Sequence, residues 1–297
     1  MSTAAPLVAL IVDRVAGEPP PWLHPVVWMG RYLDTWAAHG RRDIAPSRQV
    51  VDGALGVAVG CVLSAAAAWA AQRVTARLPG VTRPALEGAL LSLLLAERML
   101  THEVLATDRA LDDGVIEGRR RLRGLVSRDV SGLTADQVRE AALESLAENT
   151  SDSIVGPLWW YAAGGLPAAA AYRFVNTADA MWGYRTAAWE RRGKAAARLD
   201  DLCNWLPARA TAMLLAPRCD RLRLAREAHR TPSPNAGWPM AAAAVRWDVR
   251  LSKPGVYVLN AGGRRATRAT VHDAVAVVRR VALVAAVAAA MVGRWRR

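Results

Sequence analysis

Two runs of twenty residues without a charged side chain constrain the fold of this 297-residue chain more than any other feature. The first run covers residues 53–72 and the second covers residues 153–172. Twenty helical residues extend roughly 30 Å, about the hydrocarbon thickness of a bilayer. Trp69 lies near the end of the first run, and Trp159 and Trp160 lie in the second. Since tryptophan often marks the depth of the lipid headgroups, both runs predict membrane-spanning helices.

Two further stretches are weaker candidates for spans. Residues 274–293 are apolar, but Arg279 and Arg280 interrupt them about a third of the way in. An arginine at mid-membrane costs roughly 2.5–3.5 kcal/mol, and one nearer the end of a helix can extend its charged head to the surface. This stretch either crosses the membrane or lies flat on it. The fourth candidate, 202–217, carries Arg209.

Most of the remaining chain has helical patterns. Residues 97–150 form a polar helical region, in which Thr134 and Gln137 have the spacing of a capping box. Residues 249–251 and 256–258 have the pattern of one hairpin. We therefore predict an all-α fold: a polytopic integral membrane helical bundle with polar helical loops and one small hairpin. No internal repeat is visible, and we expect residues 1–297 to form a single membrane-embedded domain.

The formal charge of +13 comes almost entirely from arginine, because Lys194 and Lys253 are the only lysines. No nucleic-acid-binding signature accompanies the charge, so we expect no nucleic acid partner. A basic surface also suits anionic lipid headgroups or acidic substrates. The three cysteines have no paired spacing, and the five histidines are scattered, so neither a disulfide framework nor a zinc site is predicted.

One acidic stretch, ESLAENTSDSIVGP from Glu144, lies at the start of the second apolar run. In a continuous helix Glu144, Glu148 and Asp152 would share one face, where like charges cost about 0.2–0.5 kcal/mol per pair. A bound cation would reverse that cost, and Mg²⁺ prefers such oxygen ligands. Alternatively, the cap-forming residues 149–153 end one helix and begin the next. The two interpretations are compatible.

Two more polar clusters follow the second apolar run. Asn176 and Asp179 are three residues apart, and Asp200 and Asn204 are four apart, with Asp201 on another face. Each cluster alone is typical of a solvated helix face. Three clusters beside apolar segments favour a functional site, because polar groups at membrane edges tend to be functional.

Two loops are rich in proline. Residues 13–25 contain His24, and residues 231–239 contain Asn235 and Trp238. Prolines and glycines usually fix the backbone of a loop, and rigid loops also present binding groups well. For His24 the simpler interpretation is a structural hydrogen bond. A phosphate-binding loop is not supported, since no complete motif of that kind occurs.

Six motifs, in this order along the chain, resemble the adenosylcobinamide-phosphate synthase family of cobalamin biosynthesis, often labelled CobD/CbiB. They are DRVAGEPPPWLHPVVWMGRYL from Asp13, LVSRDVSGLT from Leu125, ESLAENTSDSIVGPL from Glu144, YRFVNTADAMWGYR from Tyr172, ARLDDLCNWLPARATA from Ala197 and TPSPNAGWP from Thr231. Three positions depart from the family pattern. Glu18 stands where the family has aspartate, and Ser151 and Ser153 replace valine- and glycine-like residues.

The resemblance implies a carbon–nitrogen ligase in the cell (inner) membrane, with several membrane passes. Such an enzyme joins aminopropanol, or its phosphate, to a propionate carboxylate of adenosylcobyric acid and gives adenosylcobinamide or its phosphate. ATP and Mg²⁺ are the implied cofactors. The implied partners are the corrinoid, the amine, the lipid bilayer and other corrinoid-assembly enzymes.

The resemblance and the polar clusters together predict the site. The expected catalytic residues are Glu144, Glu148, Asn149, Asp152, Asp179, Asp200 and Asp201. The expected substrate-binding residues are His24, Asn176, Arg185, Asn204, Arg209, Asn235 and Trp238, and the expected metal ligands are Glu144, Glu148 and Asp152.

Two other classes of protein share some of these features. A prenyl-type intramembrane transferase also places Asn- and Asp-rich helices at the membrane edge, but in a tighter Asp-x-x-x-Asp pattern, which the three polar clusters do not have. The other class is a non-catalytic membrane protein. A transporter would show more spans and some duplication, whereas a scaffold for soluble corrinoid enzymes has no distinguishing sequence feature.

Overall fold

The computed structural model describes residues 2–39, 45–183, 186 and 189–295. The described chain is mostly helical with one small hairpin, which confirms that part of the predicted fold class. The chain forms two compact units. Unit 1 comprises Met1–Ala96, Gly156–Asn204 and Ala285–Arg297, and unit 2 comprises Glu97–Val155 and Trp205–Val284. Each unit is described by itself.

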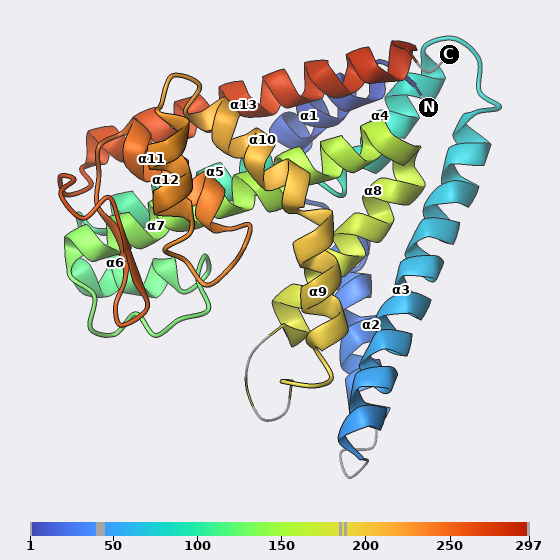
Figure 1. Cartoon of the computed structure of the whole chain (residues 1–297). Helices are drawn as coiled ribbons and strands as arrows, with labels where there is room; N and C mark the ends of the chain where they lie inside the picture. The colour runs from blue at the N-terminus through green and yellow to red at the C-terminus, as the bar shows by residue number, and fades with distance from the viewer. Residues whose placement is uncertain (1, 40–44, 184–185, 187–188, 296–297) are drawn as a thin grey trace. The chain divides into compact units, whose positions relative to one another are not determined.

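Unit 1 is built from helices that pack side by side. Its helices are α1 (Ala5–Ala16), α2 (Pro25–His39), α3 (Pro46–Thr75), α4 (Thr82–Ser92), α8 (Gly156–Trp182) and α9 (Lys194–Cys203). Helix α3 packs along α8 and α1 packs along α4 (Figure 1). Helix α13 (Arg268–Trp295) belongs to unit 2 up to Val284 and to unit 1 from Ala285.

The close packing of α3 depends on two glycines. A Cβ atom at Gly60 would overlap the ring of Phe174 on α8, and one at Gly56 would lie 2.8 Å from the indole nitrogen of Trp36 on α2. Small residues at this spacing let helix backbones approach each other. The Gly56-x-x-x-Gly60 spacing therefore serves helix packing.

Replacing Gly60 by valine should destabilise unit 1 by about 1–3 kcal/mol, because the added methyl groups force α3 away from α8. The measurement is thermal unfolding of the purified chain in detergent. Ala66→Val is the matched control, since it places the same side chain at an exposed position of the same helix. Equal losses in the two variants would show that the Gly60 contact is not required.

Two helices of the described residues, α3 and α13, are long and apolar enough to cross a membrane by length and composition. They contain the predicted spans 53–72 and 274–293. Both present large apolar side chains on their surface: Leu55, Val62 and Leu63 on α3, and Val284 and Met291 on α13 are 49–66% exposed. An apolar surface of this kind suits contact with lipid.

The other two candidate spans differ from their prediction. Residues 153–172 begin in the π-helical turn η1 (Ser151–Val155) and continue through a break in α8, where Gly164 and Gly165 leave the helical conformation. Residues 202–217 divide between α9 and α10 (Trp205–Leu215), and the 11 residues of α10 extend only about 16 Å. Neither stretch is one straight membrane-length helix. The sequence did not predict these breaks, because hydropathy reports composition and not the path of the backbone.

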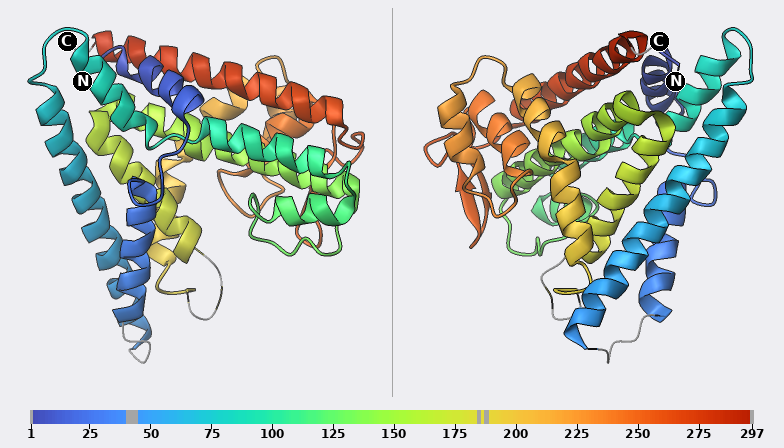
Figure 2. Two further views of the ribbon diagram at one scale, coloured as in Figure 1. Left: turned by 180° about the vertical axis from the view of Figure 1, so that it is seen from behind. Right: turned by 45° about the vertical axis from the view of Figure 1, so that its right-hand side comes forward.

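Unit 2 holds the polar helices and the hairpin. Besides η1 and α10, its elements are α5 (Glu97–Ala110), α6 (Val115–Leu122), α7 (Ala135–Thr150), α11 (Arg221–Ala228), α12 (Gly237–Arg246), β1 (Leu251–Lys253) and β2 (Tyr257–Leu259). Helix α7 is central, since it contacts α5, α6, α12 and β1. The left view of Figure 2 shows α5, α6 and α7 together.

Local sequence signals in unit 2 are confirmed. The Thr134 hydroxyl accepts from the Gln137 amide at 3.3 Å, and the Gln137 side chain accepts from the Thr134 amide at 2.9 Å, so the capping box starts α7. The hairpin forms with Leu251 opposite Leu259. Its first strand begins two residues later than predicted, since Val249 makes only an isolated bridge with Arg264.

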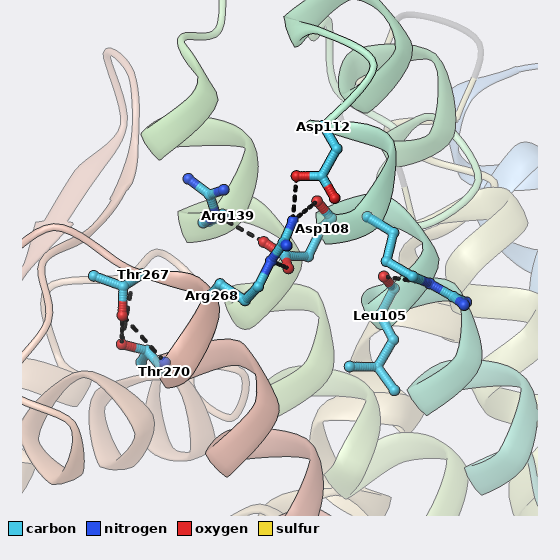
Figure 3. Close-up of polar contacts among 8 residues, drawn as sticks. Leu105, Asp108, Asp112, Arg139, Thr267, Arg268 and Thr270 are labelled. Atoms are coloured by element: carbon cyan, nitrogen blue, oxygen red, sulfur yellow. Dashed lines mark hydrogen bonds and ion pairs between the residues drawn. The ribbon is translucent and has the colours of Figure 1, made fainter.

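A buried carboxylate joins three helices of unit 2 (Figure 3). Asp108 on α5 is 1% exposed. It accepts from the Arg139 guanidinium of α7 at 2.7 Å and from the Arg268 guanidinium of α13 at 2.9 Å. Arg268 also pairs with Asp112, so two acidic and two basic side chains form one network. This network fixes the start of α13 against α5 and α7.

Arg279, one of the two arginines that interrupt the 274–293 run, also has an acidic contact. The Arg279 guanidinium lies 3.7 Å from the buried carboxylate of Glu97, and its own side chain is half exposed. The charge is therefore compensated within unit 2, which reduces its cost in α13.

Candidate functional site

A small polar cavity lies in unit 2 between three segments of chain. Its volume is about 140 Å³, and its lining comes from the loop 125–128, from α7 and from the hairpin. The charged side chains around it are Arg128, Glu144, Glu148 and Lys253. We call this cavity the polar pocket. It contains Glu144, Glu148 and Asn149, three of the predicted catalytic residues.

Glu144 is the most buried acidic group of the polar pocket, at 4% exposed. Its Oε2 atom accepts from the Arg128 guanidinium at 2.6 Å. Its Oε1 atom is buried and accepts no hydrogen bond of standard geometry from a described residue. Burial raises the pKa of Glu144, and the charge of Arg128 opposes that rise. The Tyr257 hydroxyl also interacts with the Glu144 carboxylate and opposes the rise of its pKa, so Arg128 and Tyr257 both face this group.

Local contacts hold the walls of the polar pocket in place. The Ser145 hydroxyl on α7 donates to the Leu125 carbonyl at 3.0 Å, and the Asn149 amide donates to the Ser145 carbonyl at 3.0 Å. Lys253 and Tyr257 are register partners across β1 and β2, so both side chains leave the same face of the hairpin. Burial, and then the charges of Glu144 and Glu148, raise the pKa of Tyr257.

The predicted metal ligands are not assembled as a set. The described residues contain no group of three or more His, Cys, Asp or Glu side chains that could hold a metal ion. Glu144 pairs with Arg128 instead, and Asp152 lies in the π-helical turn, which changes the helical spacing after Thr150. The alternative prediction of a helix end at 149–153 also differs from the structure, because the chain stays helical there.

A second polar cluster lies in unit 1 between α8 and α9. The Asn204 amide donates to both carboxylate oxygens of Asp200 at 3.0 Å, and the Asn176 amide donates to one of them at 3.3 Å. The Tyr172 hydroxyl donates to Asn204 at 2.8 Å. Burial raises the pKa of Asp200, the two amides oppose the rise, and the charge of Asp201 adds to it. The structure thus brings together three of the predicted residues, Asn176, Asp200 and Asn204.

Asp179 lies near the end of α8. Its carboxylate lies against Gly183, just beyond the end of α8, where a Cβ atom would overlap it. Arg185, a predicted substrate-binding residue, lies outside the described residues.

A third cluster, in unit 2, surrounds Arg209 on α10. The Arg209 guanidinium donates to the Asn235 side chain at 3.1 Å and lies 4.5 and 4.8 Å from the ring centres of Trp205 and Trp238. A cation over indole faces is attracted by the ring quadrupoles. The structure therefore gathers the predicted residues Arg209, Asn235 and Trp238.

His24 makes structural contacts, as the simpler of its two interpretations predicted. Its Nε2 atom contacts the Glu18 carboxylate, and its Nδ1 atom accepts from the Val26 amide at 3.2 Å. Glu18, which stands where the resembling family has aspartate, keeps a carboxylate at this contact. These groups fix the loop before α2.

The predicted site residues divide between the two units. Those in unit 1 are His24, Asn176, Asp179, Asp200, Asp201 and Asn204, and those in unit 2 are Glu144, Glu148, Asn149, Asp152, Arg209, Asn235 and Trp238.

Eight lining residues of the polar pocket were not predicted, among them Arg128, Lys253 and Tyr257. Arg128 lies in LVSRDVSGLT, one of the six motifs of the family resemblance, and that motif could have identified it as a site residue. Lys253 is one of two lysines in an arginine-rich chain, and the hairpin around it was noted only for its strand pattern.

The helical fold, the two candidate spans and the polar clusters define a class of helical protein with membrane-length segments. Residues 6–285 match the family described as CobD/Cbib protein, and the chain belongs to this family. It is 39% identical over 262 residues to the "Probable cobalamin biosynthesis protein CobD" of Methanothermobacter thermautotrophicus, with 85% of each chain covered.

Two further relatives have similar coverage. The protein of the same description from Methanothrix thermoacetophila is 36% identical over 96% of this chain and 95% of its own length. The "Cobalamin biosynthesis protein CobD" of Brucella suis is 37% identical over 91% of this chain and 90% of its own length. No solved structure matches the chain.

Proposed function

We propose that the chain is a membrane ligase of late cobalamin biosynthesis. It joins aminopropanol, or its phosphate, to a propionate carboxylate of adenosylcobyric acid with the consumption of ATP. Membership of the CobD/Cbib family and the names of the relatives support the pathway. The single observation that carries the chemistry is the polar pocket, in which the buried Glu144 carboxylate lies with Glu148.

A carboxylate and an amine do not condense in water unaided, because the carboxylate is a poor electrophile and the amine is protonated at neutral pH. ATP supplies the activation of the propionate as an acyl phosphate. The neutral amine then attacks the acyl carbon, the C–N bond forms, and the C–O bond to phosphate breaks. The amine loses a proton to a carboxylate during this step.

The carboxylates of the polar pocket suit this proton transfer. Glu144 is buried between the Arg128 guanidinium and the Tyr257 hydroxyl, and an ammonium group that enters the pocket can donate to its carboxylate. Arg128 holds the Oε2 atom at 2.6 Å and so fixes the orientation of the carboxylate. Glu148 lines the same cavity and is the second candidate for the proton acceptor.

The described residues do not fit a protein-held metal. The Arg128 guanidinium already balances the charge of Glu144, and those residues contain no group of three or more His, Cys, Asp or Glu side chains that could hold a metal ion. No step of the proposed reaction therefore depends on a metal ion held by this chain. Mg²⁺ remains a proposal only as the ion that accompanies ATP, since Mg²⁺ is commonly bound through substrate phosphates.

A multi-pass location in the cell membrane is part of the proposal. It is supported by the length of α3 and α13 and by the exposed apolar side chains on both helices. In water such surfaces would promote association, whereas in a bilayer they contact lipid tails.

The test is ligation by the purified chain in detergent with adenosylcobyric acid, ATP and each amine, with mass spectrometry of the corrinoid product. We expect Glu148→Gln and Asp201→Asn each to lower the rate, by roughly 10²-fold if the group transfers or holds a proton. Glu117→Gln, on α6, where the side chain is 40% exposed, is the control. No ATP-dependent product from the unaltered chain would contradict the proposed function, and wild-type rates for both variants would show that the site is misplaced.

A further inference from the structure

An apolar cavity, larger than the polar pocket, lies wholly within unit 1 between α2, α3, α4 and α8. The right view of Figure 2 shows α2, α3 and α8 side by side. The volume of the cavity is about 540 Å³, and none of the described residues that line it is charged. Leu23, Trp28 and Leu63 of its lining are 44–55% exposed, so the cavity is open to the surroundings of the chain. We call it the apolar groove.

Two contacts between α3 and α8 give the direction of the apolar groove. At one end a Cβ atom at Gly60 would overlap the Phe174 ring, so the two helices touch there and close the groove. At the other end the Leu166 amide of α8 donates to the Gln72 side chain of α3 at 2.9 Å. From Gly60 to Ala71 the groove follows α3 for about 16 Å. This length is close to that of one leaflet, roughly half of the 30 Å hydrocarbon core of a bilayer.

The polar side chains of the lining are mostly bonded to the backbone of the chain itself. The Trp28 indole donates to the Trp22 carbonyl at 3.0 Å, and the Tyr32 hydroxyl donates to the Gly56 carbonyl at 2.9 Å. Ser64 is the third polar side chain of the described lining. A ligand of the groove therefore gains apolar contact and few hydrogen bonds, which favours a hydrocarbon chain over a charged or strongly polar molecule.

Helix α3 joins the apolar groove to the surface that suits contact with lipid. The same helix is a candidate span, and it exposes Leu55 and Val62 beside the groove. Tyr32 on α2 contacts α3 near the closed end, and Trp28 lies one turn further toward the other end, where Trp22 is exposed. Because tryptophan is enriched at the depth of the lipid headgroups, this end of the groove is the one that suits a headgroup.

We infer that the apolar groove binds one acyl chain of a membrane phospholipid, with the lipid headgroup beside Trp22 and Trp28. The acyl chain fills the space that the small residues Ser64, Ala67 and Ala68 of α3 leave between the helices. The volume of the groove lies in the range of roughly 300–1,000 Å³ that ligand pockets have. The inference rests on the membrane location in the proposed function and assigns the groove no part in ligation. A helix of a second copy of the chain is an outcome of the test.

The test is photolabelling of the full chain in phosphatidylcholine nanodiscs, in which a fraction of the lipid carries a diazirine in one acyl chain. Mass spectrometry then locates the labelled residues. Leu94 and Leu166 line the groove and are 4% and 2% exposed, so they report a chain inside the groove. Val62 is exposed on α3 outside the lining and reports ordinary contact with lipid. We expect labels at all three positions of the unaltered chain.

Ala68→Phe places a ring in the apolar groove. It should lower the labelling of Leu94 and Leu166 at least about tenfold, since a chain that loses contact for two methylene groups already binds about tenfold more weakly. The labelling of Val62 should not change. Ala66→Phe is the matched control, because it adds the same ring at an exposed position of α3 outside the lining and should leave all three labels unchanged. Thermal unfolding of both variants is recorded, and the labels of the unaltered chain test the inference even if Ala68→Phe does not fold.

Labels at Val62 without labels at Leu94 and Leu166 would overturn the inference and leave the membrane location intact. A dimer in the same nanodiscs would then assign the groove to a second copy of the chain. Equal labelling of the groove in folded Ala68→Phe and in the unaltered chain, or equal losses in Ala68→Phe and Ala66→Phe, would also overturn it. No label at any of the three positions would contradict the membrane location as well. Because labelling is measured without turnover, failure of ligation in a chain with a labelled groove would contradict only the proposed reaction.

Discussion

Glu144→Gln is expected to lower the rate of amide formation by roughly 10²–10⁴-fold, the range over which a positioned acid or base contributes. Glutamine keeps the shape of the side chain but cannot take the proton of the amine. It also leaves the Arg128 guanidinium, which lies 2.6 Å from Glu144 Oε2, without its counter-charge. If Glu144 acts on the transferred proton, kcat should fall and KM should change little.

Glu140→Gln is a matched control for this prediction. Glu140 lies one turn earlier on α7, is equally buried at 4% exposed, and bonds the Ser252 hydroxyl at 2.8 Å. Burial raises its pKa as it does for Glu144, but it does not line the polar pocket. Both rates are measured on protein whose thermal unfolding in detergent is recorded. Equal losses of activity in the two variants would assign Glu144 to the stability of α7 and not to the reaction.

The features that the sequence predicts well are local ones. The capping box at Thr134 and the hairpin around Pro254 each need only a few neighbouring residues, and both form, the hairpin with strands that begin one or two residues later than predicted. The small residues Gly56 and Gly60 predict close helix packing because only their own spacing matters. Composition over twenty residues also finds α3 and α13, the two candidate spans.

The features that it predicts poorly depend on the backbone path between distant residues. The π-helical turn at Ser151–Val155 shifts Asp152 out of the spacing on which the three-carboxylate set relied. The ion pair of Glu144 joins it to Arg128, sixteen residues away, and the polar pocket adds Lys253 from a separate hairpin. A spacing rule for one helix does not identify side chains that approach from other elements.

The amide cluster around Asp200 and the aromatic cluster around Arg209 were predicted in part. Asn176, Asp200 and Asn204 were singled out by short spacings on two helices, and the structure joins them through the Asp200 carboxylate. Arg209 and Asn235 are 26 residues apart and belong to two different motifs, and the Arg209 guanidinium donates to the Asn235 side-chain oxygen at 3.1 Å. Here the resemblance to a family supplied what spacing alone did not, namely which distant motifs to consider together.

Asp108→Asn should have the largest effect on stability of any substitution considered, a loss of about 3 kcal/mol. Asp108 is 1% exposed and balances the guanidinium groups of Arg139 and Arg268 (Figure 3). Asparagine keeps one acceptor but removes the charge, so the partly buried Arg139 loses its counter-ion. The expected loss lies at the lower end of the range for broken buried pairs, because the Arg268 side chain is 46% exposed and water screens its charge.

Asp112→Asn separates burial from charge in this network. Asp112 pairs with the same Arg268, but its side chain is 59% exposed, so its removal should cost only about 0–1 kcal/mol. Thermal and denaturant unfolding of the two variants in detergent measures the difference, and Asp108→Asn combined with Arg139→Met tests the pairing. If Arg139 is destabilising only when unpaired, the double variant should recover part of the loss caused by Asp108→Asn. Equal costs at Asp108 and Asp112, or no recovery in the double variant, would mean that the buried carboxylate does not hold α5, α7 and the start of α13 together.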